Sequence, residues 1–168
     1  MEIRFIKAGG TIEFSECGNS YELFEREYYK FGEVDADPIT QWLNLSKAKK
    51  DIDNTDPILL QLILELHKKV EKLEDIITHR AVSLLHLDYK LELNEIGFEH
   101  IKLHNLKKGH IYYARIDIPI FPKRLIPIFF EALDDNIGLI KKIHPRDEQN
   151  LDSYIVSKER EYLREIKR

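Results

Sequence analysis

The sequence contains one cysteine, Cys17, and one tryptophan among its 168 residues. A single cysteine excludes a disulfide within the chain and is typical of a reducing compartment. No apolar run reaches the length of about 18 residues that a transmembrane helix needs, so no membrane span is expected. Residues 1–10 lack the apolar segment of a secretory signal. We therefore expect a cytoplasmic protein in which Cys17 is a surface or half-buried thiol.

The motifs of common enzymes are also missing. The sequence has no glycine-rich phosphate loop, no nucleophile elbow and no Cys/His spacing for zinc. His100 and His104 lie four residues apart, but in a segment that reads as strand followed by loop, where they do not share the face of a helix. We therefore expect no catalytic residue, no metal site and no cofactor. An enzyme on an unrelated fold remains an alternative.

Charge is unevenly distributed along the chain. Hydrophobic residues make up 43% and charged residues 33%, with a net charge of −4. Residues 1–56 hold 7 Lys and Arg against 12 Asp and Glu, so the first third of the chain is acidic. An acidic segment argues against a nucleic-acid-binding arm. It suits either a basic patch on a protein partner or a solvated surface.

Residues 1–56 are predicted to form a helical N-terminal extension. Gly9-Gly10 and residues 15–20 read as loops. A first helix follows Ser20, with aromatic residues three and four positions apart, and a second begins at Asp37-Pro38. The segment is too short for a core of its own. Its aromatic residues should therefore pack elsewhere or form a docking surface: Tyr21, Phe24, Tyr28, Phe31 and Trp42.

Residues 57–79 are predicted to form an oligomerisation helix that starts at Asp56-Pro57. Apolar residues recur there at alternating intervals of four and three, which is the spacing of a heptad seam: Leu59, Ile63, Leu66, Val70, Leu73 and Ile77. Leucine stands at each d position and a β-branched residue at each a position, a choice that favours parallel dimers. Lys69 and Glu74 take g and e positions. A four-helix assembly and an amphipathic helix packed on its own domain remain alternatives.

Beyond residue 79 the apolar period becomes that of strands. Strands are predicted over 84–93, 96–103, 111–118, 125–133 and 137–143, with Pro127 placing part of the fourth at a sheet edge. A helix is predicted over 147–167, with Leu151, Tyr154, Ile155 and Tyr162 facing inward. The predicted fold class is α+β: N-terminal helices, including the heptad helix, then a small closed or half-closed antiparallel barrel with a C-terminal helix.

The segment Glu92-Leu93-Asn94-Glu95-Ile96-Gly97-Phe98 resembles the strand-turn signature of PilZ domains, [Asp/Asn]-x-Ser-x-x-Gly followed by an apolar residue. Residues 116–119 and the closing helix, residues 151–161, also resemble that family. The resemblance covers residues 80–168 and implies a PilZ-like barrel. The heptad helix ahead of it is similar to that of atypical, oligomeric PilZ proteins.

The resemblance implies a binding site for cyclic di-GMP, formed in the family by an Arg-x-x-x-Arg stretch and the Asp/Asn and Ser of the strand motif. The matching positions here are Arg80, Glu92, Asn94 and Gly97. Only Gly97 fits outright: Arg80 has no second arginine nearby, and Glu92 replaces a short polar residue. Losing two charge-assisted contacts weakens binding by about 10²–10⁴-fold. Arg115 with Lys123 or Arg124, or basic residues of a second chain, would have to replace them.

The sequence therefore predicts a non-enzymatic, PilZ-like signalling adaptor. It would act through protein-protein contacts as a dimer or higher oligomer, in bacterial motility or surface attachment. A cyclic di-GMP receptor with a rearranged site is the alternative. No feature of the sequence identifies the protein partner.

Overall fold

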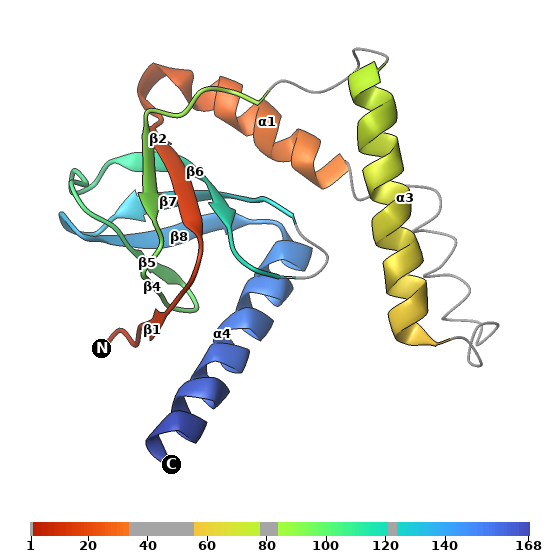
Figure 1. Ribbon diagram of the computed structural model, residues 1–168. Helices are drawn as coiled ribbons and strands as arrows, with labels where there is room; N and C mark the ends of the chain where they lie inside the picture. The colour runs from red at the N-terminus through yellow and green to blue at the C-terminus, as the bar shows by residue number, and fades with distance from the viewer. Residues whose placement is uncertain (1, 34–55, 78–83, 121–123) are drawn as a thin grey trace. The chain divides into compact units, whose positions relative to one another are not determined.

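The computed structural model describes residues 2–33, 56–77, 84–120 and 124–168. The chain is α+β, as predicted, with an antiparallel sheet (Figure 1). Its described helices are α1 (Tyr21–Glu33), α3 (Pro57–Ile77) and α4 (Pro145–Ile166), with a 3₁₀ turn at Gly18–Ser20. Its strands are β1 (Ile6–Lys7), β2 (Thr11–Glu16), β3 (Tyr89–Glu92), β4 (Glu95–Ile96), β5 (His100–Lys102), β6 (Ile111–Asp117), β7 (Ile126–Ala132) and β8 (Ile137–Ile143). No helix of the described ranges has both the length and the apolar character needed to cross a membrane.

The sheet curls until its two ends meet. The strand order is β1-β4-β5-β8-β7-β6-β2-β3, and every pairing is antiparallel. Leu93 N–H donates to Gly10 O at 3.0 Å and Ala8 N–H donates to Asn94 O at 2.8 Å. These bonds join the β1–β4 pairing to the β2–β3 pairing. Residues 6–16 and 89–96 therefore form one kinked ladder, the seam of a small barrel.

Gly10 marks the kink in this seam. A Cβ atom at Gly10 would lie 2.2 Å from the backbone oxygen of Asp117, the last residue of β6. Only glycine allows the two backbones to approach so closely. The glycine pair predicted to lie in a loop is thus the place where the first strand bends from β1 into β2.

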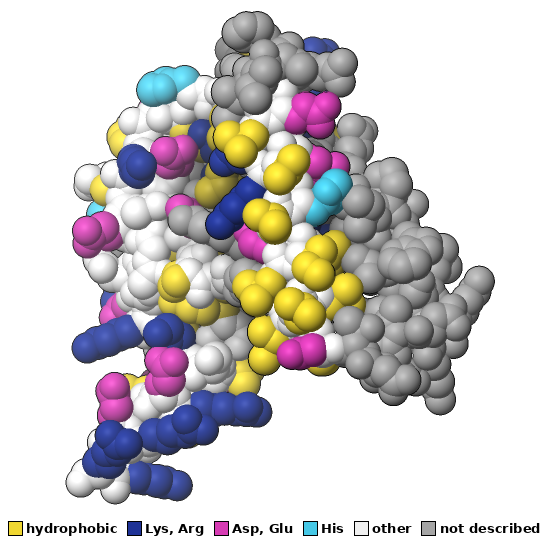
Figure 2. Space-filling view, turned by 45° about the vertical axis from the view of Figure 1, so that its right-hand side comes forward, with side chains coloured by type: hydrophobic (Ala, Val, Ile, Leu, Met, Phe, Trp, Pro, Cys, Tyr) yellow, Lys and Arg dark blue, Asp and Glu magenta, His cyan; other side chains and the backbone are white. Residues whose placement is uncertain are grey.

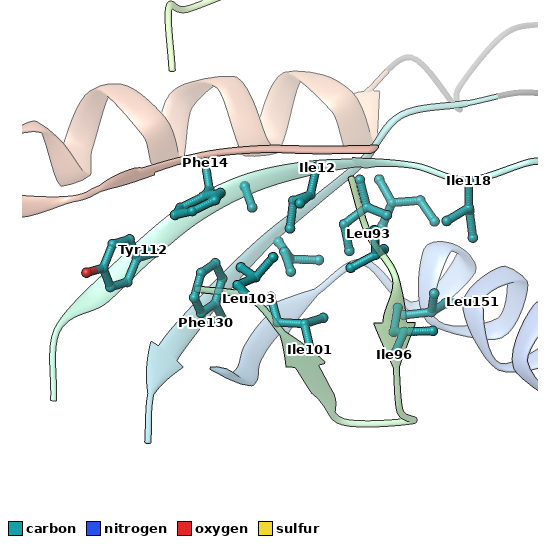
Figure 3. Close-up of a cluster of buried hydrophobic side chains, with 14 of the residues drawn as sticks. Ile12, Phe14, Leu93, Ile96, Ile101, Leu103, Tyr112, Ile118, Phe130 and Leu151 are labelled. Carbon is teal, nitrogen blue, oxygen red and sulfur yellow. The ribbon is translucent and has the colours of Figure 1, made fainter. Parts of the chain in front are cut away.

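The barrel interior is filled by alternate residues of the strands, since successive side chains of a strand point to opposite faces. Phe130 stacks on Tyr112 with ring centroids 5.2 Å apart, and Phe14 meets both rings edge-on (Figure 3). The other buried side chains of this layer are mainly aliphatic: Ile12, Leu93, Ile96, Ile101, Leu103, Ala114, Ile116, Ile118, Ile126 and Ile128. This core holds the strands in one register.

Helix α1 covers part of the outer wall. Phe24 stacks on Tyr113 of β6 with centroids 5.1 Å apart, and Tyr28 packs on Phe129 of β7 at 5.5 Å. Of the outcomes expected for the aromatic residues of this segment, Phe24 and Tyr28 therefore show packing on the β domain, whereas Trp42 lies outside the described residues.

Arg115 of β6 is buried beneath α1. It is 4% exposed, and its guanidinium donates to both carboxylate oxygens of Glu27, at 2.9 and 3.1 Å, and to Glu13 of β2 at 2.9 Å. The bond from Arg115 lowers the pKa of Glu13. Burial raises the pKa of Tyr113, and the Glu27 carboxylate adds to the effect. The outer wall is therefore fastened to α1 by one buried cation shared between two carboxylates.

Helix α4 begins at Pro145, which needs no hydrogen-bond partner at a helix start. Asp147, in the first turn of α4, is fully buried. Arg124 donates to its two carboxylate oxygens, from Nε at 2.6 Å and from a terminal nitrogen at 3.1 Å. Leu151, Tyr154 and Ile155 are buried, as predicted. Tyr162 was predicted to face inward but is 58% exposed, because the helix has run past the barrel by that point.

Several sequence predictions are wrong in detail. The N-terminal segment is not only helical: β1 and β2 belong to the sheet, and Cys17 is buried. The predicted strand 96–103 is interrupted by a turn between β4 and β5. Pro127 is not at an edge, because β7 pairs with both β6 and β8. Its missing N–H is tolerated since the β8 ladder stops at Ile128, one residue later in the chain.

The chain divides into two compact units. One comprises residues 1–28 and 86–168 and contains the barrel and α4; the other comprises residues 29–85 and contains α3. The barrel thus draws on residues from both sides of the segment that contains α3, which the predicted boundaries at residues 56 and 80 did not anticipate.

The buried Arg115 should make the protein sensitive to loss of Glu27. Replacing Glu27 with Ala leaves the guanidinium with Glu13 as its remaining carboxylate partner, so the free energy of unfolding should fall by about 2–3 kcal/mol. Glu22→Ala, at an exposed position of the same helix, should change it by no more than about 0.5 kcal/mol. Urea unfolding of the two variants measures the difference, and equal losses would contradict the anchoring role.

Candidate functional site

Helix α3 begins at a strong start signal. The Asp56 carboxylate accepts the N–H of Ile58 at 3.0 Å, and the Asp56 carbonyl accepts the N–H of Leu60 at 3.0 Å. Pro57 takes the first helical position. The helix then runs 21 residues to Ile77, within the predicted range 57–79.

The main feature of α3 is a row of exposed apolar side chains, called here the α3 stripe. Its seven described members are between 53% and 68% exposed: Ile58, Leu59, Leu62, Ile63, Leu66, Val70 and Leu73. Each member has another three or four residues away, and the two adjacent pairs, Ile58-Leu59 and Leu62-Ile63, widen the row, so all seven share one side of the helix. Hydrophobic side chains line this helix in the space-filling view (Figure 2). Contiguous exposed apolar surface of this kind marks interaction sites.

The α3 stripe contains five of the six residues predicted for the oligomer interface. Leu59, Leu66 and Leu73 stand at the predicted d positions, and Ile63 and Val70 at the predicted a positions. The side chain of Ile77, the last residue of the helix, lies outside what the structure describes. Pairing of the stripe with a second copy stays a prediction.

The residues implied by the PilZ resemblance lie near the seam of the barrel. Glu92 ends β3 and Asn94 lies between β3 and β4, both exposed. Gly97 follows β4, and a Cβ atom there would meet the backbone oxygen of Arg4 at 2.8 Å, so this position requires glycine. Arg80 lies outside the described residues.

Glu92 and Asn94 line a cleft of about 490 Å³, called here the β3–β5 cleft. Leu91 and Glu95 complete one wall, and the other wall is formed by residues that sequence reasoning did not select: Lys102, Leu103 and His104. Recognising a turn at residues 97–99 would have identified them, because this turn folds residues 102–104 back toward residues 91–95.

The charges of this cleft do not suit a dianionic ligand. Lys102 is held by Glu95 at 2.5 Å, and Glu92 adds a further exposed carboxylate. No arginine lines the cleft among the residues described. The arginines considered as substitutes are bound elsewhere: Arg115 is buried between Glu13 and Glu27, and Arg124 holds Asp147.

The cysteine is a poor nucleophile. Burial, helped by the neighbouring charge of Glu16, raises the pKa of the Cys17 thiol to about 12. Nucleophilic chemistry needs the thiolate, which such a pKa keeps scarce at neutral pH. In the described ranges no three His, Cys, Asp or Glu side chains are grouped closely enough to hold a metal ion.

The charges of the β3–β5 cleft lead us to expect no binding of cyclic di-GMP. At low salt, where attraction between charges is least screened, titration should show no saturable binding with a dissociation constant below about 10 µM. The reason is the exposed Glu92 and the commitment of Arg115 and Arg124 to other carboxylates. Calorimetric titration of the intact chain measures it. Tighter binding that vanished in Arg80→Ala would overturn the prediction and place the ligand where the PilZ resemblance implies.

Comparison of the chain with models of protein families, with curated proteins and with solved structures finds no match. The PilZ resemblance of residues 80–168 therefore stays a prediction carried by its sequence pattern. Two observed features can serve in recognition: the α3 stripe and the β3–β5 cleft.

Proposed function

We propose that this chain is a non-enzymatic, self-associating adaptor in which α3 pairs with α3 of a second copy. The observation that carries the proposal is the α3 stripe, whose seven large apolar side chains are each more than half exposed in the single chain. Isolated exposed leucines are ordinary, but a continuous row at helical spacing is not. A second copy supplies the same row and covers it.

The composition of the stripe favours two parallel strands. β-branched residues at a and leucines at d fit the side-chain layers of a parallel dimer. In that register Lys69 of one copy faces Glu74 of the other, a pair that contributes about 0–1 kcal/mol at a surface. Ile58 and Leu62 widen the apolar arc near the start of α3, which is the feature that would favour four helices instead.

The energetics support a dimer that depends on concentration. Covering the exposed part of each stripe residue contributes about 1 kcal/mol. Summed over two copies, this is about 14 kcal/mol, against a cost of association of about 4–15 kcal/mol. With a cost of about 6 kcal/mol the surplus corresponds to a dissociation constant of about 1 µM, which is the affinity we expect.

The adaptor role is the broader part of the proposal. It is supported by the PilZ resemblance of residues 92–98 and by the two surfaces suited to recognition, the α3 stripe and the β3–β5 cleft. The raised pKa of Cys17, which makes the thiol a poor nucleophile, also favours a binding role over catalysis. A cytoplasmic role in bacterial motility or surface attachment follows from the same resemblance. Identification of the proteins that co-purify with the intact chain tests it.

The first test of self-association is a double variant, Val70→Asp with Leu73→Asp. It places two charges in the seam and should convert the assembly to monomers at tens of micromolar. The matched control is Lys68→Gln with Lys72→Gln, which shifts the net charge by the same amount at non-seam positions and should still associate. Light scattering reports the mass, and a monomeric unaltered chain would refute the proposal.

The second test concerns orientation. In a parallel pair the two Leu59 side chains meet, so Leu59→Cys should form a disulfide-linked dimer under mild oxidation. In an antiparallel pair they would lie about 20 Å apart, beyond the roughly 7 Å that a disulfide spans between Cα atoms. Cys17 is buried and should not compete. Non-reducing electrophoresis shows the product, and cross-linking of Leu73→Cys but not Leu59→Cys would argue against a parallel pair in register.

A further inference from the structure

The barrel seam leaves one strand edge open. Among the described residues, β3 pairs only with β2, whereas β4, which continues the same strand, pairs with β1 on one side and β5 on the other. The β4–β5 ladder stops at Glu95 opposite Lys102. Beyond that point the two chains separate, and the β3–β5 cleft lies between them.

The orientation of the open edge follows from the ladder. Leu93 N–H points to Gly10, and in an antiparallel pair the residues that bond to a given neighbour alternate. The backbone N–H and C=O groups of Leu91 and Tyr89 therefore point toward β2, and those of Lys90 and Glu92 point away from it, on the side where Glu92 lines the cleft. Such groups are a template for a further strand.

The walls of the cleft have two layers. Leu91 is half-buried and Leu103 is buried, and both belong to the apolar interior layer of the barrel. Glu92, Asn94 and His104 are exposed and form the outer rim. A strand laid along β3 would therefore place alternate side chains against leucine and against the rim.

We propose that the β3–β5 cleft binds an extended peptide segment of a partner protein, added as a strand to the open edge of β3. The alternation of the barrel wall sets its chemistry: apolar residues toward Leu91 and Leu103, and basic residues toward the rim. Main-chain bonds supply the affinity in this mode of recognition and the pockets supply the selectivity.

Charge selects basic over acidic residues in this segment. Glu95 is paired with Lys102, and Lys90 lies 3.7 Å from Glu13 on the neighbouring strand. Glu92 is the exposed carboxylate on the rim next to the open edge. A lysine or arginine of the added strand supplies its partner.

The test uses a capped hexapeptide of alternating lysine and valine as the probe, titrated into the ¹⁵N-labelled intact chain. We expect saturable changes in the amide resonances of Lys90, Glu92 and the cleft residues, with half-saturation below about 1 mM. Absence of saturation, or changes confined to the α3 stripe, would overturn the proposal.

A pair of variants separates backbone pairing from charge. Glu92→Pro removes the outward N–H, which β2 does not use, and should weaken peptide binding at least tenfold. Glu92→Gln keeps the N–H and should weaken it no more than about fivefold, the range of one exposed ion pair. Equal losses would mean that charge alone acts, against strand addition.

A modified probe covers the case in which the proline variant misfolds. The same hexapeptide with N-methyl groups on its edge-facing residues keeps charge and side chains but loses its donors. Strand addition requires that it bind the unaltered chain at least tenfold more weakly. Unchanged binding would overturn the proposal.

Discussion

The pairing of residues 6–16 with residues 89–96 is the contact on which the rest of the structure depends. It joins the two ends of the sheet, and without it the interior side chains of β2 and β3 would face solvent. The N–H of Asp88 is held by the Ser15 hydroxyl at 2.6 Å, so the chain returns to the point from which it left. The segment between Ser15 and Asp88 is therefore an excursion between two adjacent strands, and it contains α3.

The polar residues of the barrel strands point outward, because strand alternation places apolar side chains inside. These outward residues are of two kinds: those covered by α1 and those exposed to solvent. Outside, α1 covers the wall beside β2, β6 and β7, and a charged residue there is buried as deeply as the core. Arg115 is tolerated because Glu13 and Glu27 satisfy its guanidinium, a requirement that any buried charge has to meet. Away from α1, as at Glu92 and Asn94, the outward residues of the described wall are exposed.

Strong local patterns allowed some elements to be predicted closely and others not at all. The alternation over residues 137–143 predicted β8, and Asp56-Pro57 predicted the start of α3. Both patterns lie within consecutive residues and so do not depend on distant contacts. β1 and β2 were missed because Gly9-Gly10 interrupts a short run and its partners are distant in sequence. Arg115 was considered as a substitute ligand-binding arginine but is buried, since alternation tells which face a residue takes but not whether a helix covers it. The α3 stripe could be predicted from spacing, whereas Lys102 and His104 join the cleft only through the β4–β5 register.

The excursion also fixes an order of events during synthesis. Ser15 and Asp88 are 73 residues apart, so β2 leaves the ribosome long before either of its neighbours, β3 and β6, exists. Doubling the length of such a loop adds only about 0.6 kcal/mol to its closure, so the stability of the finished barrel is little affected. The rate of closure is affected, because distant pairings form slowly. Helix α3 is synthesised before either partner of β2 exists, so the first strand has to wait, unpaired, until the strands that flank it have been made.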